Sequence, residues 1–156
     1  MTVSNSTDRI SLYGLPLGTL LIYALSGMSI AHTSAIDYYT SGNAKDKKGD
    51  IDGAIADYTR ALKLDPKNPL IYRNRGYLKH KKGDLDGAIE DYNSALELDP
   101  RSEWSFHNRG RAKYSKDDFE GAIKDYNRAL ELDPRNALAT KIAVMPRLER
   151  AILLGL

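Results

Sequence analysis

A block of sequence recurs three times in this chain at a constant spacing of 34 residues, and it limits the possible folds more than any other feature. Each copy ends in a proline preceded by Ala-Leu-x-Leu-Asp, and these prolines are Pro66, Pro100 and Pro134. Further upstream each copy carries Gly-Ala-Ile-x-Asp-Tyr, and before that a glycine at position 42, 76 or 110. A period of this length is typical of folds in which one supersecondary unit stacks on the next.

Each copy is predicted to hold two helices of about 14 residues. Between the two helices lie Gly49-Asp50, Gly83-Asp84 or Asp117-Asp118. Glycine commonly ends a helix, aspartate caps the start of the next one, and the closing proline stops the second helix. Because a unit of this size cannot bury its apolar face alone, the three copies must stack. We therefore predict an all-α fold.

The repeat resembles that of the tetratricopeptide repeat (TPR) family, with units at residues 35–68, 69–102 and 103–136. The family's large aromatic residue early in the unit is matched by Tyr38, Tyr72 and Phe106. Its small residue at the helix crossing is matched by Gly42, Gly76 and Gly110, and its alanines by Ala54, Ala61 and their counterparts. The resemblance implies an α-solenoid of three helix-turn-helix units whose first helices line a concave surface. It also implies a protein that binds other proteins.

The chain continues beyond these units at its C-terminal end. Residues 137–145 begin like a fourth unit and are predicted to form a capping helix that Pro146 ends. The tail, residues 151–156, is apolar where the end of a solenoid is normally polar. This tail either folds back onto the third unit or mediates self-association with another chain.

At the N-terminal end, residues 10–31 carry no charged side chain. Residues 1–34 are therefore read as a cleaved signal peptide, with 15–25 as its apolar centre, or as an uncleaved membrane anchor that uses the whole run. In both readings the repeats lie outside the cytoplasm, either exported (periplasmic or otherwise extracytoplasmic) or anchored to a membrane. The third reading is an extra helix on a cytosolic domain.

The net charge of +2 conceals a strong separation of charge within each unit. The first helices (35–48, 69–82 and 103–116) hold 12 basic and 3 acidic side chains, whereas the second halves hold 7 basic and 16 acidic ones. Capping and helix dipoles explain part of this pattern. We also expect Arg75 to pair with Asp91, and Arg109 with Asp125. The other basic residues still fall on the first helices, which predicts a basic concave groove.

Helical spacing selects the side chains that face this groove. Arg and Tyr, which dominate interface energetics, are frequent among them, and Asn amides can bind the backbone of an extended peptide. The predicted peptide-binding residues are Tyr39, Asn43, Arg73, Asn74, Tyr77, His80, His107, Asn108, Arg111 and Tyr114. We therefore predict a non-catalytic scaffold or adaptor that binds a peptide segment of a partner protein, with acidic segments favoured by the basic groove.

Some members of the family hold the C-terminal carboxylate of a chaperone peptide with a set of Lys, Asn and Arg side chains. Of those positions only Asn43 and Asn74 match, and Tyr39, Trp104 and Asn108 occupy the others. We therefore do not predict that ligand. The alternative function is binding of a single-stranded nucleic acid or another polyanion by the same basic helices, whose aromatic side chains could stack on bases. An export signal argues against it.

Neither an enzyme nor a metal site is predicted, and no cofactor is expected. The three histidines of the chain are His32, His80 and His107. They lie in different parts of the sequence, with no nucleophile or carboxylate at a spacing that would build a catalytic site. The chain has no cysteine. Asp50-x-Asp52-Gly53 resembles part of a calcium loop, but Lys48 and Thr59 stand where acidic ligands belong, so helix capping explains these aspartates better.

Overall fold

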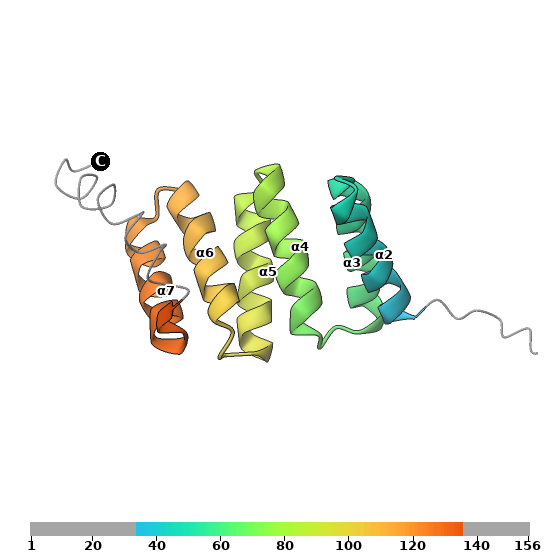
Figure 1. Ribbon diagram of the computed structural model, residues 1–156. Coiled ribbons are helices and arrows are strands. Elements are labelled where there is room, and N and C mark those ends of the chain that lie inside the picture. Colours follow the sequence, from blue (N-terminus) through green and yellow to red (C-terminus); the bar gives the residue numbers. More distant parts are fainter. Residues whose placement is uncertain (1–33, 136–156) are drawn as a thin grey trace, which may run out of the picture. The chain divides into compact units, whose positions relative to one another are not determined.

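The computed structural model describes residues 34–135, which form six α-helices and, within that range, no strand (Figure 1). Consecutive helices pair into three hairpins, one for each copy of the repeat. The helices are α2 (Ala35–Lys47), α3 (Ile51–Leu64), α4 (Pro69–Lys82), α5 (Leu85–Leu98), α6 (Glu103–Ser115) and α7 (Phe119–Leu132). The predicted all-α solenoid of three helix-turn-helix units is confirmed.

The turn inside each hairpin is formed by the residues that the repeat places there. The carboxylates of Asp50, Asp84 and Asp118 cap α3, α5 and α7, and each accepts a hydrogen bond of 2.9 or 3.0 Å from the backbone N–H three residues later. Gly83 follows α4 at a φ of 91°, a left-handed conformation that glycine adopts readily. Asp117 takes the equivalent place in the third hairpin at a φ of 62°. The predicted capping role of the aspartates is thus confirmed.

Within each hairpin, a glycine of the first helix faces a tyrosine ring of the second. A Cβ atom added at Gly42 would lie 2.7 Å from Cε1 of Tyr58, so only glycine lets the helices approach this closely. Tyr58 is 1% exposed, and its counterparts Tyr92 and Tyr126 are also buried. These rings, together with the alanines of the repeat, form the interior of each hairpin.

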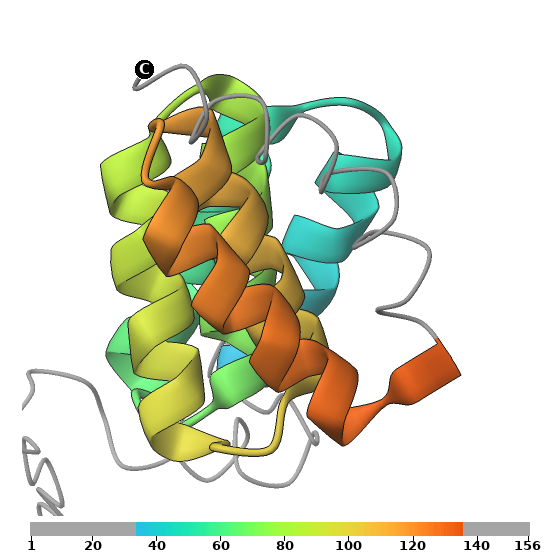
Figure 2. The ribbon, with the colours of Figure 1, turned by 90° about the vertical axis from the view of Figure 1, so that its left-hand side faces the viewer.

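The hairpins stack in chain order, with α3 packed against α4 and α5 against α6; Figure 2 views this stack from the third hairpin. Ile71 and Leu78 of α4 are fully buried and belong to the same apolar cluster as Tyr58. Farther along, Ala112 of α6 packs into a cluster with Tyr92. Each hairpin therefore buries the apolar face of its neighbour, as the repeat period requires.

In the second and third hairpins, a buried aspartate of the second helix binds an arginine of the first helix of the same hairpin. Nε and Nη2 of Arg75 donate to the two carboxylate oxygens of Asp91 at 2.8 and 2.7 Å, and Asp91 is 3% exposed. Arg109 and Asp125 repeat this geometry at 2.8 and 2.6 Å, so both predicted pairs are confirmed. Burial lowers the pKa of Arg75, but the bonds to Asp91 outweigh it and raise the pKa overall, so the guanidinium stays charged.

The same two arginines also connect each hairpin to the preceding one. Nη1 of Arg75 donates to Oγ1 of Thr59 in α3 at 3.1 Å. Nη1 of Arg109 donates to Oδ1 of Asn93 in α5 at 2.7 Å. One guanidinium group therefore holds three helices together, two in its own hairpin and one in the hairpin before it.

The first hairpin of the described residues binds its buried aspartate differently. Ser41 replaces the arginine and donates to Asp57 at 2.6 Å. Lys45 and Arg60 supply the positive charges, each 2.7 Å from the carboxylate. Burial raises the pKa of Asp57, but the bonds to these three side chains outweigh it and lower the pKa overall, so the carboxylate stays charged.

The described part of the chain begins at Ser34, whose hydroxyl caps α2 in a capping box with Asp37. The predicted signal peptide or membrane anchor, the capping helix over 137–145 and the apolar tail over 151–156 lie outside the described residues. Among residues 34–135, none of the helices combines the length and the apolar character that crossing a bilayer demands.

Candidate peptide-binding face

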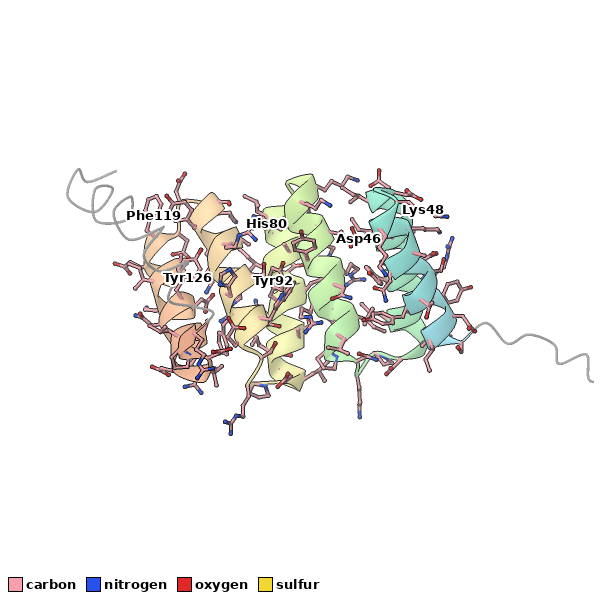
Figure 3. The ribbon with its side chains drawn as sticks, viewed as in Figure 1. Asp46, Lys48, His80, Tyr92, Phe119 and Tyr126 are labelled. Atoms are coloured by element: carbon pink, nitrogen blue, oxygen red, sulfur yellow. The ribbon has the colours of Figure 1, made fainter. Side chains whose placement is uncertain are left out.

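Side chains spaced three or four residues apart on α2, α4 and α6 form a row on each helix, and we call these rows together the first-helix face. Contacts between neighbouring first helices divide this face into two parts. The first junction, between α2 and α4, contains Tyr39, Asn43 and Asn74. The second junction, between α4 and α6, contains Arg73, Tyr77, His80 and Trp104. We also count Arg111, whose charge acts on His80, and His107, one turn before Arg111 on α6. In Figure 3 the labelled His80 lies in the region where the second hairpin faces α6.

In the first junction the polar side chains hydrogen bond to one another. Nδ2 of Asn74 donates to Tyr39 Oη at 3.3 Å and to Asn43 Oδ1 at 3.4 Å. The hydroxyl of the buried Tyr58 also donates to Asn43 Oδ1, at 2.7 Å. Burial raises the pKa of Tyr58 to about 12, which keeps this hydroxyl protonated. The amide nitrogen of Asn74, the amide oxygen of Asn43 and the hydroxyl of Tyr39 thus already have partners within the fold.

The second junction is built around the indole ring of Trp104. The guanidinium carbon of Arg73 lies 4.9 Å from the centre of this ring, a cation–π distance. The rings of Tyr77 and Tyr92 lie 6.0 and 6.4 Å from it, centre to centre. Trp104 nevertheless keeps 36% of its surface exposed, so part of this residue is open to a ligand.

Two histidines lie near Arg111 in the same junction. Burial lowers the pKa of His80, the charge of Arg111 lowers it further, and the same two causes lower the pKa of His107. Both imidazoles are therefore neutral at pH 7. His80 Nε2 lies 3.4 Å from the hydroxyl of Ser115 in α6, and the ring of His107 lies edge-on to Tyr126 at 5.8 Å.

Two of the ten predicted residues lie apart from these junctions. Asn108 is 3% exposed, and its Nδ2 donates to the carbonyl oxygen of Trp104 at 2.8 Å, one turn earlier in the same helix. Tyr114 packs against Phe119 of α7 with ring centres 5.5 Å apart. Helical spacing places both residues on α6, but it does not show which side chains a neighbouring turn or helix occupies.

Most basic side chains of the first helices form ion pairs within the fold. The side chains paired with Asp residues are those of Lys45, Arg75, Lys79, Lys81, Lys82, Arg109, Lys113 and Lys116. Those that form no ion pair within residues 34–135 are Lys47, Lys48, Arg73 and Arg111. The charge separation seen in the sequence is therefore largely compensated internally. Both arginines that are left lie in the second junction.

Trp104 is a residue of this face that helical spacing alone did not select. It shares its place in the repeat unit with Ile36 and Leu70. These three side chains are 36, 73 and 45% exposed, respectively. A large apolar residue at an exposed place in every unit is the signal that could have identified it, because core residues of the repeat are buried.

The second junction thus combines two guanidinium groups that form no ion pair within residues 34–135, an exposed indole ring and neutral imidazoles. Such a set can bind a carboxylate and also pack against an apolar side chain beside it. Within the part of the chain that the structure describes, no three His, Asp or Glu side chains are grouped so that they could hold a metal ion.

Comparison with known protein families matches this chain to the pattern described as TPR repeat at residues 42–83 and 76–117. The pattern described as tetratricopeptide repeat matches residues 104–136. Among curated protein sequences, none matches the chain.

Solved structures match the chain over most of its length. The first TPR of Spaghetti (RPAP3), bound to the HSP90 peptide SRMEEVD, is 31% identical with a TM-score of 0.71, over 81% of this chain and 99% of that one. The Arabidopsis OM64 TPR domain is 27% identical with a TM-score of 0.70, over 74% and 94% of the two chains. The Sgt2 TPR domain from Aspergillus fumigatus is 25% identical with a TM-score of 0.70, over 78% and 82%.

Proposed function

Because the chain belongs to the tetratricopeptide repeat family and is a protein–protein interaction scaffold, we propose that its first-helix face binds an extended acidic segment of a partner protein, without catalysis. The observation that carries the proposal is the second junction, where Arg73 and Arg111 form no ion pair within the described residues and Arg73 lies over the ring of the exposed Trp104. A partner carboxylate would compensate a charge that these residues leave free, and this favours binding.

Two further features support a peptide as the partner. The first TPR of Spaghetti, similar to this chain over 99% of its length, is bound to the acidic peptide SRMEEVD. Here Ile36, Leu70 and Trp104 recur at one exposed place in each unit, next to the polar side chains of the same helices. An extended segment that mixes apolar and acidic residues would use both kinds of contact.

The alternative, a single-stranded nucleic acid or another polyanion, has less support. To bind such a ligand, the protein would need a continuous row of unpaired Lys or Arg side chains along the ligand's phosphate backbone. It would also need aromatic rings on which the bases of the ligand stack. Within the described residues, the free arginines of the first helices are confined to the second junction, and the first junction presents neutral side chains. Two arginines at one junction suit a peptide with one or two acidic residues better than they suit a row of phosphates.

A crosslinking pull-down from the source cell tests the proposal. The intact protein is compared with an Arg73→Glu/Arg111→Glu double variant and with a control, Arg101→Glu/Lys124→Glu, in which the same charge is changed at exposed positions on the α5–α6 loop and on α7. We expect the double variant to stay folded but to lose most partners, and the control to keep them. Equal recovery by all three proteins would show that the first-helix face is not the binding surface.

The polyanion alternative is tested in the same setting with a single-stranded oligonucleotide. Binding is followed by the fluorescence of Trp104, the single tryptophan of the chain. We expect no saturable change in the fluorescence at 150 mM salt. Tight binding that falls steeply as salt is added would favour the alternative function instead.

We further propose that residues 10–31 take this module out of the cytoplasm, on the strength of their uncharged, apolar sequence. Mass spectrometry of the mature protein distinguishes the three readings. A chain that starts after residue 31 indicates a cleaved signal peptide, and an intact chain in the membrane fraction indicates an anchor. An intact chain in the soluble cytosol would contradict the proposal.

A further inference from the structure

Arg73 is the one arginine at its place in the three repeat units. The first unit has Tyr39 there, whose hydroxyl accepts a hydrogen bond from Asn74 at 3.3 Å. The third unit has His107, whose ring lies edge-on to Tyr126. In those two units the side chain at this place makes contacts within the fold, and the second unit presents a cation instead.

The guanidinium group of Arg73 is positioned from two sides. Its carbon lies 4.9 Å from the centre of the indole ring of Trp104, a distance at which a planar guanidinium is attracted to the ring. Its Nε lies 3.5 Å from Oδ1 of Asn74, whose own amide nitrogen is bonded to Tyr39 and Asn43 in the first junction. A cation that is already oriented loses little freedom when a ligand binds.

Two of the three guanidinium nitrogens remain for a ligand. Within residues 34–135, neither Nη atom of Arg73 has a hydrogen-bond or ion-pair partner. Arg73 is half-buried, and Trp104 beside it is 36% exposed, so the group is reached from solvent. Two neighbouring N–H groups of a guanidinium match the two oxygens of a carboxylate, and this bidentate geometry is not available to a lysine. The arrangement therefore selects a carboxylate.

Arg73 lies in the middle of a row of side chains on α4. Leu70 precedes it by three residues and Tyr77 follows it by four, so these side chains share one face of the helix. Leu70 is 45% exposed. The ring of Tyr77 lies 6.0 Å from that of Trp104, centre to centre. A carboxylate bound to Arg73 would therefore have an apolar or aromatic contact on either side of it along α4.

The spacing of this row suits an extended segment. With a rise of about 1.5 Å per residue in a helix, Leu70 lies about 4.5 Å and Tyr77 about 6 Å from Arg73 along the axis. Side chains on one side of an extended chain are two residues and about 6.6 Å apart. Three such side chains in succession would thus meet Leu70, Arg73 and Tyr77. A chain that ended at Arg73 would leave one of the two flanking contacts unused, which favours an internal acidic residue over a C-terminal carboxylate.

Building on the proposed function, we propose that Arg73 binds the side-chain carboxylate of an Asp or Glu inside the partner segment. Apolar residues two positions before and two positions after this residue contact Leu70 on one side and the pair of Tyr77 and Trp104 on the other. The indole ring of Trp104 holds the guanidinium group in place. The partner is therefore recognised by the pattern apolar-x-acidic-x-apolar, and its C-terminal carboxylate is not read.

Four acetylated peptides test the pattern with the full chain, and binding is followed by the fluorescence of Trp104 and by calorimetry. The reference is acetyl-GSLSESLSG-amide, and in the second peptide Gln replaces Glu. The third is this Gln peptide with a free C-terminal carboxylate. The fourth, acetyl-GSESLSLSG-amide, has the composition of the reference but places Glu before both leucines. We expect the second and third to bind about tenfold more weakly than the reference, and the fourth about threefold more weakly.

Variants of the protein test the role of Arg73 against the reference peptide. Arg73→Gln should weaken binding about tenfold, and Arg73→Lys, which keeps the charge but loses the planar guanidinium, about threefold. Arg111→Gln, in the same junction, should weaken it by no more than about twofold. Arg101→Gln, at an exposed position on the α5–α6 loop, should not change it. Circular dichroism of each variant shows that a loss of binding is not a loss of fold.

Four results would overturn this inference and leave peptide binding by this face intact. They are normal binding by Arg73→Gln, equal binding by Arg73→Lys and the intact protein, binding of the third peptide as tight as that of the reference, and binding of the fourth as tight as that of the reference. If none of the four peptides binds at millimolar concentration, the inference also fails, and the pull-down then decides the proposed function independently.

Discussion

The two junctions of the first-helix face occupy equivalent places in the repeat but have different chemistry. In the first junction, Asn43 accepts the hydroxyl of the buried Tyr58, and the polar groups bind one another. In the second junction, the hydroxyl of the corresponding Tyr92 has no hydrogen-bond partner within the described residues. Two arginines there form no ion pair within the same residues, and one of them, Arg73, lies over the exposed Trp104. The same backbone thus carries one junction whose polar groups bind one another and one that keeps two arginines and a buried hydroxyl without such partners in the described residues.

The comparison shows how a repeat protein separates stability from recognition. The residues that hold the hairpins together recur in each unit, namely glycine under tyrosine and a buried aspartate bound to basic side chains. The residues that differ between units lie on the surface of the first helices, where a change costs little packing. Recognition is therefore expected where the units differ, and stability where they agree.

The largest effect on stability is expected from removing Arg75 or Arg109, each of which connects three helices. Arg75→Ala leaves the buried Asp91 with Lys79 alone, and Arg109→Ala leaves Asp125 with Lys113 alone. Because a buried carboxylate that loses its main partner is costly, each variant should lower the free energy of unfolding by about 3 kcal/mol. Urea unfolding followed by circular dichroism measures this loss.

The matched control for this prediction is Arg128→Ala. Arg128 pairs with Glu131 on the exposed surface of α7 at 2.7 Å, and this change should cost less than about 0.5 kcal/mol. A loss below about 1 kcal/mol for Arg75→Ala would mean that the bidentate pair is not what holds α4 to its neighbours.

The next effect sharpens the contrast between the two junctions by making the same substitution in each. Tyr58→Phe removes a hydrogen bond to Asn43 and should cost about 1 kcal/mol. Tyr92→Phe removes a hydroxyl that has no partner within the described residues, so the free energy of unfolding should stay the same or rise slightly. Equal losses in the two variants, measured by urea unfolding, would contradict the difference between the junctions.

The smallest effect is a dependence of stability on pH that comes from the histidines of the second junction. The pKa values of His80 and His107 are lowered in the folded state by burial and by Arg111, from an ordinary value of 6.5. As pH falls through about 6.5, the unfolded chain binds protons that the folded chain does not, so stability present above this pH is lost below it. The midpoint of urea unfolding should therefore fall slightly between pH 7.5 and 5.5.

A His80→Gln/His107→Gln variant provides the control for this pH dependence. It should show a flatter profile over the same range, because neither glutamine titrates. The carboxylate of Asp57, whose pKa is lowered in the folded state, does not interfere, since its contribution is lost only as pH falls below its ordinary value of 3.8. An unchanged slope in the double variant would show that other groups produce the effect.

Much of the fold followed from the sequence, because its determinants are local. A glycine or aspartate at a turn acts within three or four residues, as the caps by Asp50, Asp84 and Asp118 show. The pairs of Arg75 with Asp91 and Arg109 with Asp125 could also be predicted, since both members recur at a fixed spacing within one hairpin. Eight of the ten residues predicted to bind a peptide lie at the two junctions, and their role in binding stays a prediction.

What the sequence by itself determined is the set of helices, their capping and the pairing of neighbours in a hairpin, since these depend on contacts between residues close in the chain. Only the tertiary structure decided which charges remain free. Lys82 pairs with Asp52, and Lys116 pairs with Asp86. Each pair joins two neighbouring hairpins, so it depends on how the units stack. The physical reason is that periodicity fixes the direction of a side chain on its own helix, whereas its partner is set by the distance to another helix.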